Sequence, residues 1–288
     1  MSKSLYKSFG QEFYPYEAIR ALKFADKARI SDRHALIAHI ASQLPQPGAR
    51  TRLRIAEKFA QRYLTIGGQP GAAATQPFVR LVARQRHAPA QIELLYYRLA
   101  QVDTLVGALA RDLFYPVCIG GRPPLGLTSA EFAARNGGQL LSIAPLLTRA
   151  FILDYAKTCW SFTNRSTIDR SLRVLQGAGL VARERMGELR GHPPAFRLSS
   201  HNVSLTTFLF ALYDEFLPHV HDANFVLAPN VLPLTDFART LLLSPAQVEA
   251  HCDAARRHQL LAQPARGGLR LVFGSLEALV DALLAKAI

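Results

Sequence analysis

The chain has 288 residues, of which 34 are Lys or Arg and 21 are Asp or Glu, so its formal net charge at pH 7 is +13. This length suits two or three compact units, and the basic balance favours a polyanionic partner such as nucleic acid. The sequence has no run of about 18 apolar residues that could span a membrane, and its first residues lack an apolar signal sequence, so we expect a cytoplasmic protein.

Motifs for catalysis or metal binding are absent from the sequence. Cys118, Cys159 and Cys252 are too far apart to form a metal or redox motif. His219 and His221 are two residues apart, but two ligands on a loop do not define a metal site. There is no nucleotide-binding glycine loop, no zinc-protease motif and no cluster of carboxylates. We therefore expect a protein that is not an enzyme and that needs no cofactor and no metal.

The charged residues are unevenly distributed along the chain. Residues 1–66 hold 12 basic and 5 acidic groups, and residues 141–200 hold 9 and 4. Residues 201–288, in contrast, hold 6 basic and 8 acidic groups. Because a local excess of positive charge attracts phosphates, we expect a polyanion to bind within the first 200 residues.

In chain order, apolar residues at helical spacing first predict an N-terminal helical domain over residues 1–120. One expected helix covers residues 49–64, "ARTRLRIAEKFAQRYL". A longer helical pattern covers residues 89–114, with a break expected near Asp103, and Pro116 is expected to end it.

The helix over residues 49–64 carries basic residues four positions apart, which predicts a basic stripe along one of its sides. The stripe consists of Arg50, Arg54, Lys58 and Arg62. The other side is expected to contain Leu53, Ala56, Ala60, Tyr63 and Leu64. Like charges four residues apart repel each other, so a bound polyanion would stabilise the stripe. The alternative is a solvated helix face.

Residues 121–200 are expected to form a second unit. Thr128 or Ser129 is expected to cap a short helix, and Pro145 to begin a longer apolar helix. A basic helix follows over about Asn164–Ala178. Two strand-like stretches that flank a polar loop then predict a β-hairpin. This order of helix, helix and hairpin predicts a winged-helix unit.

The basic helix of this unit is expected to have two different sides. The buried side is expected to contain Ile168, Leu172 and Leu175, and the opposite side Ser166, Arg170 and Arg173. Ser161 or Thr163 can cap its N-terminus. Gly177 or Gly179 can end it with left-handed backbone, after which Leu180 returns to the core.

In a helix-turn-helix arrangement, such a helix enters the major groove of DNA with its N-terminal residues leading, and the hairpin can reach the neighbouring backbone. Guanidinium and hydroxyl groups suit phosphates and guanine edges. The expected DNA contacts are Asn164, Arg165, Ser166, Arg170, Arg173, Arg183, Arg185 and Arg190. The alternative is a protein-docking module whose Arg residues are only solvated.

Residues 201–288 repeat the order of helix, helix and hairpin, with Ser244 expected as a helix cap and Arg266-Gly267-Gly268 as the hairpin turn. Because this segment is net acidic, we expect it to bind DNA poorly and to serve in protein docking or dimerisation; the alternative is a domain that only packs. The predicted fold class is mainly α, an N-terminal helical domain followed by two winged-helix-like units with short β-hairpins.

Three stretches carry a family resemblance: "ARTRLRIAEKFAQRYL" (49–64), "IELLYYRLAQVDTLVGALARDLFYP" (92–116) and "FTNRSTIDRSLRVLQGAGLV" (162–181). In order and spacing they resemble the BrxA-type proteins of bacterial bacteriophage-exclusion (BREX) defence systems. The resemblance implies a small, mostly helical, non-enzymatic DNA-binding protein. It would act beside larger defence proteins such as a methyltransferase, an ATPase and a phosphatase-like protein.

The sequence therefore predicts a DNA-binding component of phage defence that contacts duplex DNA mainly through phosphates. Two alternatives stay open. A winged-helix transcription regulator would bind as a symmetric dimer and prefer one operator sequence. A protein-only scaffold would use its basic faces for acidic partners and would not bind DNA at moderate salt. The oligomeric state does not follow from the sequence.

Overall fold

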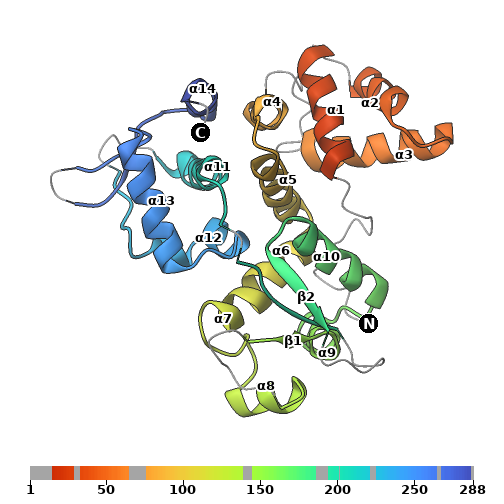
Figure 1. The fold of residues 1–288 in the computed structure, drawn as a ribbon, viewed down its shortest axis with the longest axis vertical. Coiled ribbons are helices and arrows are strands. Elements are labelled where there is room, and N and C mark those ends of the chain that lie inside the picture. The colour runs from red at the N-terminus through yellow and green to blue at the C-terminus, as the bar shows by residue number, and fades with distance from the viewer. Residues whose placement is uncertain are drawn as a thin grey trace. The chain divides into compact units, whose positions relative to one another are not determined.

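The computed structural model describes residues 15–28, 33–64, 76–138, 145–185, 194–200, 202–220, 225–264 and 267–286. This part of the chain is mainly helical with a few short antiparallel strands, as the sequence predicts (Figure 1). Its contacts divide it into two compact units. The described residues of unit 1 lie within Ala100–Asn202 and Pro233–Val248, and those of unit 2 within Tyr14–Leu99, Val203–Leu232 and Glu249–Ile288.

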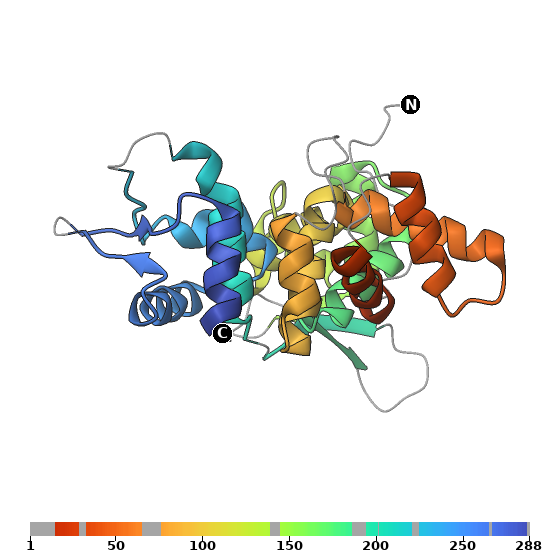
Figure 2. The same cartoon turned by 90° about the horizontal axis from the view of Figure 1, so that it is seen from above.

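Unit 2 is built mostly from helices that are far apart in the sequence. Its elements are α1 (Pro15–Ala28), α2 (Arg33–Gln43), α3 (Ala49–Phe59), the π-helical turn η1 (Ala60–Leu64), α4 (Pro77–Arg84), α5 (Ala88–Val102) up to Leu99, α11 (Leu205–Phe216), the 3-10 turn η4 (Leu217–His219), α13 (Pro245–Arg257) from Glu249, β4 (Leu261–Ala262), β5 (Arg270–Leu271) and α14 (Leu276–Lys286). Helix α1 packs against α4, and α2 packs against α3. Helix α14 contacts both α4 and α11, so the last helix completes a core begun by the first ones (Figure 2).

Buried polar side chains join α5 to α11. Glu93 on α5 is only 2% exposed, and it accepts hydrogen bonds from the backbone N–H and the hydroxyl of Ser204 at 2.9 and 2.6 Å. Ser204 is in turn the N-cap of α11. The hydroxyl of Tyr97 donates to a carboxylate oxygen of Asp214 at 3.2 Å. Because an unpaired buried polar group is costly, these bonds fix how the two helices pack.

Tyr213 on α11 ties the C-terminal hairpin to this core. Its hydroxyl donates to the carbonyl of Leu260 at 2.7 Å and accepts from the backbone N–H of Val272 at 2.8 Å. These two backbone groups flank the strands β4 and β5. One side chain thus holds both ends of the hairpin against the helix.

The structure describes Gly267 and Gly268 of the predicted C-terminal hairpin turn, whereas Arg266 lies outside the described residues. Strands β4 and β5 pair antiparallel, and Leu227 forms a further bridge with Leu269. Gly267 and Gly268 have φ angles of 82° and 86°, a backbone conformation that favours glycine. Ser244 accepts a hydrogen bond within the first turn of α13 and caps it as expected.

Unit 1 contains the whole segment expected over residues 121–200. Its elements are the end of α5, α6 (Thr104–Ala108), the π-helical turn η3 (Leu109–Phe114), α7 (Tyr115–Cys118), α8 (Ser129–Arg135), β1 (Leu147–Thr148), α9 (Arg149–Trp160), α10 (Arg165–Gly177), β2 (Val181–Arg185), β3 (Pro194–Leu198), α12 (Asp236–Thr240) and the start of α13; the 3-10 turn η5 (Leu232–Leu234) links the two units. The three strands form an antiparallel sheet in the order β1-β3-β2. Edge-to-face contacts of Phe132 with Phe151, and of Tyr155 with Trp160, fill the core beneath it.

Two of the predicted helix boundaries in unit 1 are confirmed, and a third is not. The break near Asp103 is confirmed, because its carboxylate accepts from the N–H of Val106 and caps α6. Thr128 caps α8 in a capping box with Glu131, as expected. The expectation for Pro116 was wrong. It lies in the first turn of α7, where its missing N–H is not needed.

The expected start of the apolar helix at Pro145 was also wrong. Residues 147–148 instead form β1, which pairs with β3. Helix α9 starts only after Thr148, whose hydroxyl accepts from the N–H of Phe151 at 3.2 Å. The sequence did not indicate β1, because two residues are too few for a strand pattern.

His251 on α13 allows a pH test of the packing in unit 2. Its ring stacks on Phe208 with the centroids 4.9 Å apart, and burial lowers its pKa below the usual 6.5, although Glu93 opposes this shift. The unfolded chain therefore binds a proton at His251 more readily than the folded chain does. The contribution of the neutral His251 ring to folding stability is present above pH 6.5 and is lost as the pH falls through and below that value. We expect thermal denaturation to show a lower melting temperature at about pH 5.5 than at about pH 7.5. The difference should shrink in His251→Phe; an unchanged difference would contradict the assignment.

Candidate nucleic-acid interface

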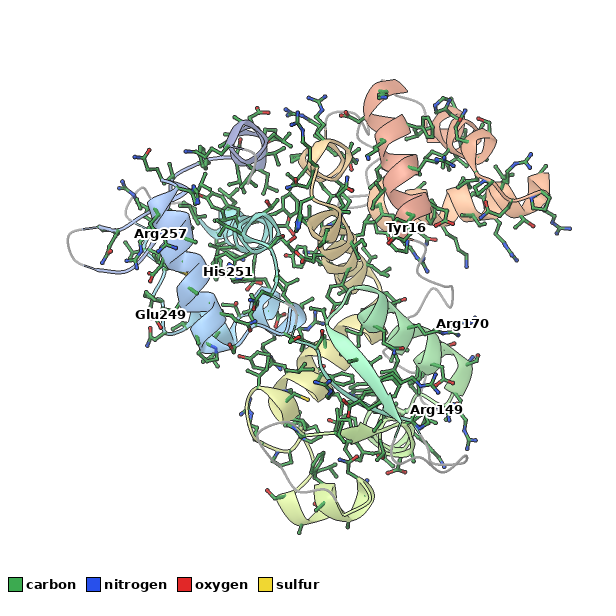
Figure 3. All side chains as sticks on the ribbon, viewed as in Figure 1. Tyr16, Arg149, Arg170, Glu249, His251 and Arg257 are labelled. Carbon is green, nitrogen blue, oxygen red and sulfur yellow. The ribbon has the colours of Figure 1, made fainter. Side chains whose placement is uncertain are left out.

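Helix α10 in unit 1 has the two sides that its sequence predicts. Ile168, Leu172 and Leu175 are at most 1% exposed and face the core. On the other side, Arg170 is half-buried (Figure 3). Arg173, three residues further along the helix, is exposed. An apolar side that is buried to this degree fixes which residues α10 presents to a partner.

The N-terminus of α10 differs in detail from the prediction. Asn164 is the N-cap, because its side-chain oxygen accepts from the N–H of Thr167 at 3.2 Å. The same oxygen accepts from the hydroxyl of Ser166 at 2.9 Å. The expected caps were wrong, since Ser161 has a φ of 52° and ends α9 instead. Arg165 and Ser166 nevertheless lie exposed in the first turn, as expected.

The C-terminus of α10 closes as predicted. Gly179 has a φ of 75°, and the N–H of Leu180 donates to the carbonyl of Leu175 at 3.1 Å. Leu180 is 5% exposed and so returns to the core. This pattern of a left-handed glycine and a buried following residue directs the chain into β2.

Both acidic residues of the basic stretch 161–186 are held in ion pairs. Asp169 on α10 accepts two parallel hydrogen bonds from Arg149, the first residue of α9, each 2.7 Å long. The hydrogen bond to Asp169 raises the pKa of the Arg149 guanidinium. On the hairpin, Glu184 of β2 pairs with Arg197 of β3. The negative charges of Asp169 and Glu184 are thus each paired with an arginine from a neighbouring element.

Two hollows open on the surface formed by α9, α10 and the β2–β3 hairpin, and Arg149 lines both. One, of about 460 Å³, lies between α10 and the hairpin; it is lined by Arg149, Asp169, Leu172, Arg173, Gln176, Arg183, Pro194 and Phe196. The other, of about 650 Å³, lies between α9 and α10; it is lined by Arg149, Ala150, Leu153, Asp154, Lys157, Phe162, Thr163, Arg165 and Ile168. Each hollow contains three basic residues and one acidic residue, which suits an anionic group.

The hairpin residues of the predicted interface are only partly described. Arg183 on β2 is exposed and lines the first hollow. Arg185 belongs to β2, but its side chain is not among those that the structure describes, and Arg190 lies outside the described residues. The sequence reasoning missed Arg149 and Gln176. An acidic residue such as Asp169 among the basic residues of α10 suggests a basic partner, but the sequence does not indicate that this partner is Arg149.

The predicted stripe on α3, in unit 2, is shorter than expected. Arg50 and Arg54 are exposed and Lys58 is half-buried, but Arg62 is only 2% exposed, so its place in the stripe was wrong. Each step of four residues turns an α-helix position by about 40°, which carries the stripe toward the core. The π-helical turn η1 then changes the spacing where Arg62 lies.

The apolar side of this helix was mostly predicted correctly. Ala56, Ala60, Tyr63 and Leu64 are buried, whereas Leu53 is 44% exposed. The expectation for Leu53 was therefore wrong. The stripe and the surface of α10 belong to different units, so each is a separate candidate interface.

Among the residues that the structure describes, no group of three or more His, Cys, Asp or Glu side chains could hold a metal ion. None of the helices in the described ranges is long and apolar enough to cross a membrane. No protein-family model, curated protein or solved structure matches the chain.

Proposed function

We propose that residues 129–198 form a winged helix that binds duplex DNA. The order of elements supports this, with α9 and α10 in the positions of a helix-turn-helix and β2 and β3 in the position of a wing. The observation that carries the proposal is the two-sided α10, whose apolar side is buried while Arg165, Ser166 and Arg173 lie exposed. A helix so oriented can present its first turns to the major groove.

The proposed contacts are mainly with phosphates. Guanidinium groups on α9, α10 and β2 can each donate two parallel hydrogen bonds to a phosphate. Such contacts hold a protein on DNA without reading its sequence. We therefore propose binding that depends strongly on salt and weakly on base sequence. The three remaining basic residues of the α3 stripe, Arg50, Arg54 and Lys58, are a second proposed phosphate surface.

The biological setting is proposed from the sequence resemblance alone. Three stretches resemble the BrxA-type proteins of bacteriophage-exclusion systems, and the basic, helical chain fits a small DNA-binding partner of larger defence proteins. We propose a non-enzymatic role in the cytoplasm, where such a protein would meet phage and host DNA. For the net acidic residues 201–288 we propose protein docking, with the paired strands β4 and β5 as a winged-helix-like hairpin.

A titration with two unrelated duplexes of equal length tests the proposed function. We expect similar affinities for both duplexes and a steep, linear fall of log affinity with log salt. Fluorescence anisotropy over a series of salt concentrations measures both quantities. A preference of several kcal/mol for one duplex would favour a sequence-specific regulator. Absence of binding at moderate salt would favour a protein-only scaffold.

A further inference from the structure

We infer that the hollow between α10 and the β2–β3 hairpin binds one backbone phosphate, and that Asp169 lowers the affinity by competing with this phosphate for the arginines. This rests on the proposed DNA binding. It places one of the phosphate contacts in the hollow and names Asp169 as the residue that weakens this contact. The phosphate would replace Asp169 as the acceptor nearest to the hollow's guanidinium groups.

The hollow has the chemistry of a phosphate site. Three arginines line it, and each comes from a different element: Arg149 from α9, Arg173 from α10 and Arg183 from β2. Gln176 adds an amide that can donate to an oxygen. The apolar residues Leu172 and Phe196 complete its lining. Basic residues from three elements thus share the lining of one hollow of about 460 Å³, whereas a basic helix face that is only solvated would involve a single element.

Asp169 is the one acidic residue in this lining. Its two oxygens accept the Nε and one Nη hydrogen of Arg149 at 2.7 Å, the same fork geometry that a phosphate would use. Both side chains are about one-third exposed, so a ligand can reach them from solvent. A carboxylate in this position acts in two ways: it occupies Arg149, and it repels an incoming phosphate.

The negative charge of Asp169 can be removed while the size of the side chain is kept. Asp169→Asn keeps one oxygen as an acceptor for Arg149 and removes the negative charge. Because one unit charge at contact distance near a surface is worth about a three- to tenfold change in affinity, we expect Asp169→Asn to bind duplex DNA about three- to tenfold more tightly at low salt. Added salt should reduce the gain, since it screens the repulsion.

Gln176→Glu provides the opposite change in the same hollow. It adds a carboxylate of nearly the same size as the amide, and we expect affinity to fall by about three- to tenfold. Matched controls lie beside Arg256 in the C-terminal part of the chain, where Asp253 and Gln263 both accept from this arginine. Asp253→Asn and Gln263→Glu make the same charge changes outside the hollow and should alter affinity by less than about twofold.

Anisotropy titrations of the full chain and its four variants test the inference. Opposite shifts for Asp169→Asn and Gln176→Glu, with both controls near the unchanged protein, would support it. If the unchanged protein binds DNA and the two hollow variants bind like it, or shift no more than the controls, the phosphate site is wrong while DNA binding stands. If the unchanged protein does not bind, the proposed function and the inference both fail. Equal melting temperatures confirm that the comparison concerns folded proteins; should Asp169→Asn unfold, the direction of Gln176→Glu still decides.

Discussion

Replacing Leu172 with Ala is expected to lower the free energy of unfolding by about 2–5 kcal/mol. Leu172 is 1% exposed on the buried side of α10, so the shorter side chain would leave a cavity that its neighbours fill only partly. Chemical denaturation measures the change. The substitution removes no charge, so the salt slope of DNA binding by the folded fraction should stay unchanged.

Leu125 offers a matched control for this substitution in the same unit. It is 86% exposed, so Leu125→Ala removes the same atoms without opening a cavity and should change stability by less than about 0.5 kcal/mol. Equal stabilities for Leu172→Ala and Leu125→Ala would mean that α10 does not pack as described. The two-sided helix on which the proposed function depends would then be wrong.

Replacing Arg170 and Arg173 together with Ala is expected to lower the slope of log affinity against log salt by about 2, because each lost phosphate contact removes about 0.9 from it. Neither residue belongs to the buried side of α10, since Arg170 is half-buried (Figure 3) and Arg173 is exposed. Removal of Arg173, which is exposed, should have little effect on folding. DNA titrations at several salt concentrations, together with melting curves, separate the two effects.

A second double variant controls for the loss of two positive charges. Arg256→Ala/Arg257→Ala removes the same charge from α13 in the net acidic part of the chain, and we expect its salt slope to stay unchanged. If the α10 variant melts early, its arginines belong to a structural network. If it melts normally and binds unchanged, the stripe formed by Arg50, Arg54 and Lys58 becomes the leading DNA surface.

Local sequence patterns predicted the local structure of this protein well. The spacing of Ile168, Leu172 and Leu175 identified the buried side of α10, and Gly179 identified its end. The break expected near Asp103 is present, and there the short polar side chain of Asp103 caps α6. Such features depend on a few neighbouring residues, so a single sequence contains enough information to find them.

Features that depend on distant residues could not be predicted. The partner of Asp169 is Arg149, 20 positions earlier, and only the tertiary fold brings the two together. The burial of Arg62 depends on a π-helical turn that the spacing of basic residues does not indicate. The hollow beside α10 combines three elements, so it exists only once the hairpin has folded back.

The assembly of each unit from separate stretches has a consequence for synthesis on the ribosome. Helix α4 emerges early, but Arg80 on it pairs with Asp281 near the other end of the chain. In unit 1, the hydroxyl of Tyr115 donates to the carbonyl of Pro233. At about 5–20 residues per second, the early helices wait on the order of ten seconds or more for these partners. Neither core can close before these partners have been synthesised, so the apolar sides of α4 and α5 are exposed to chaperones until then.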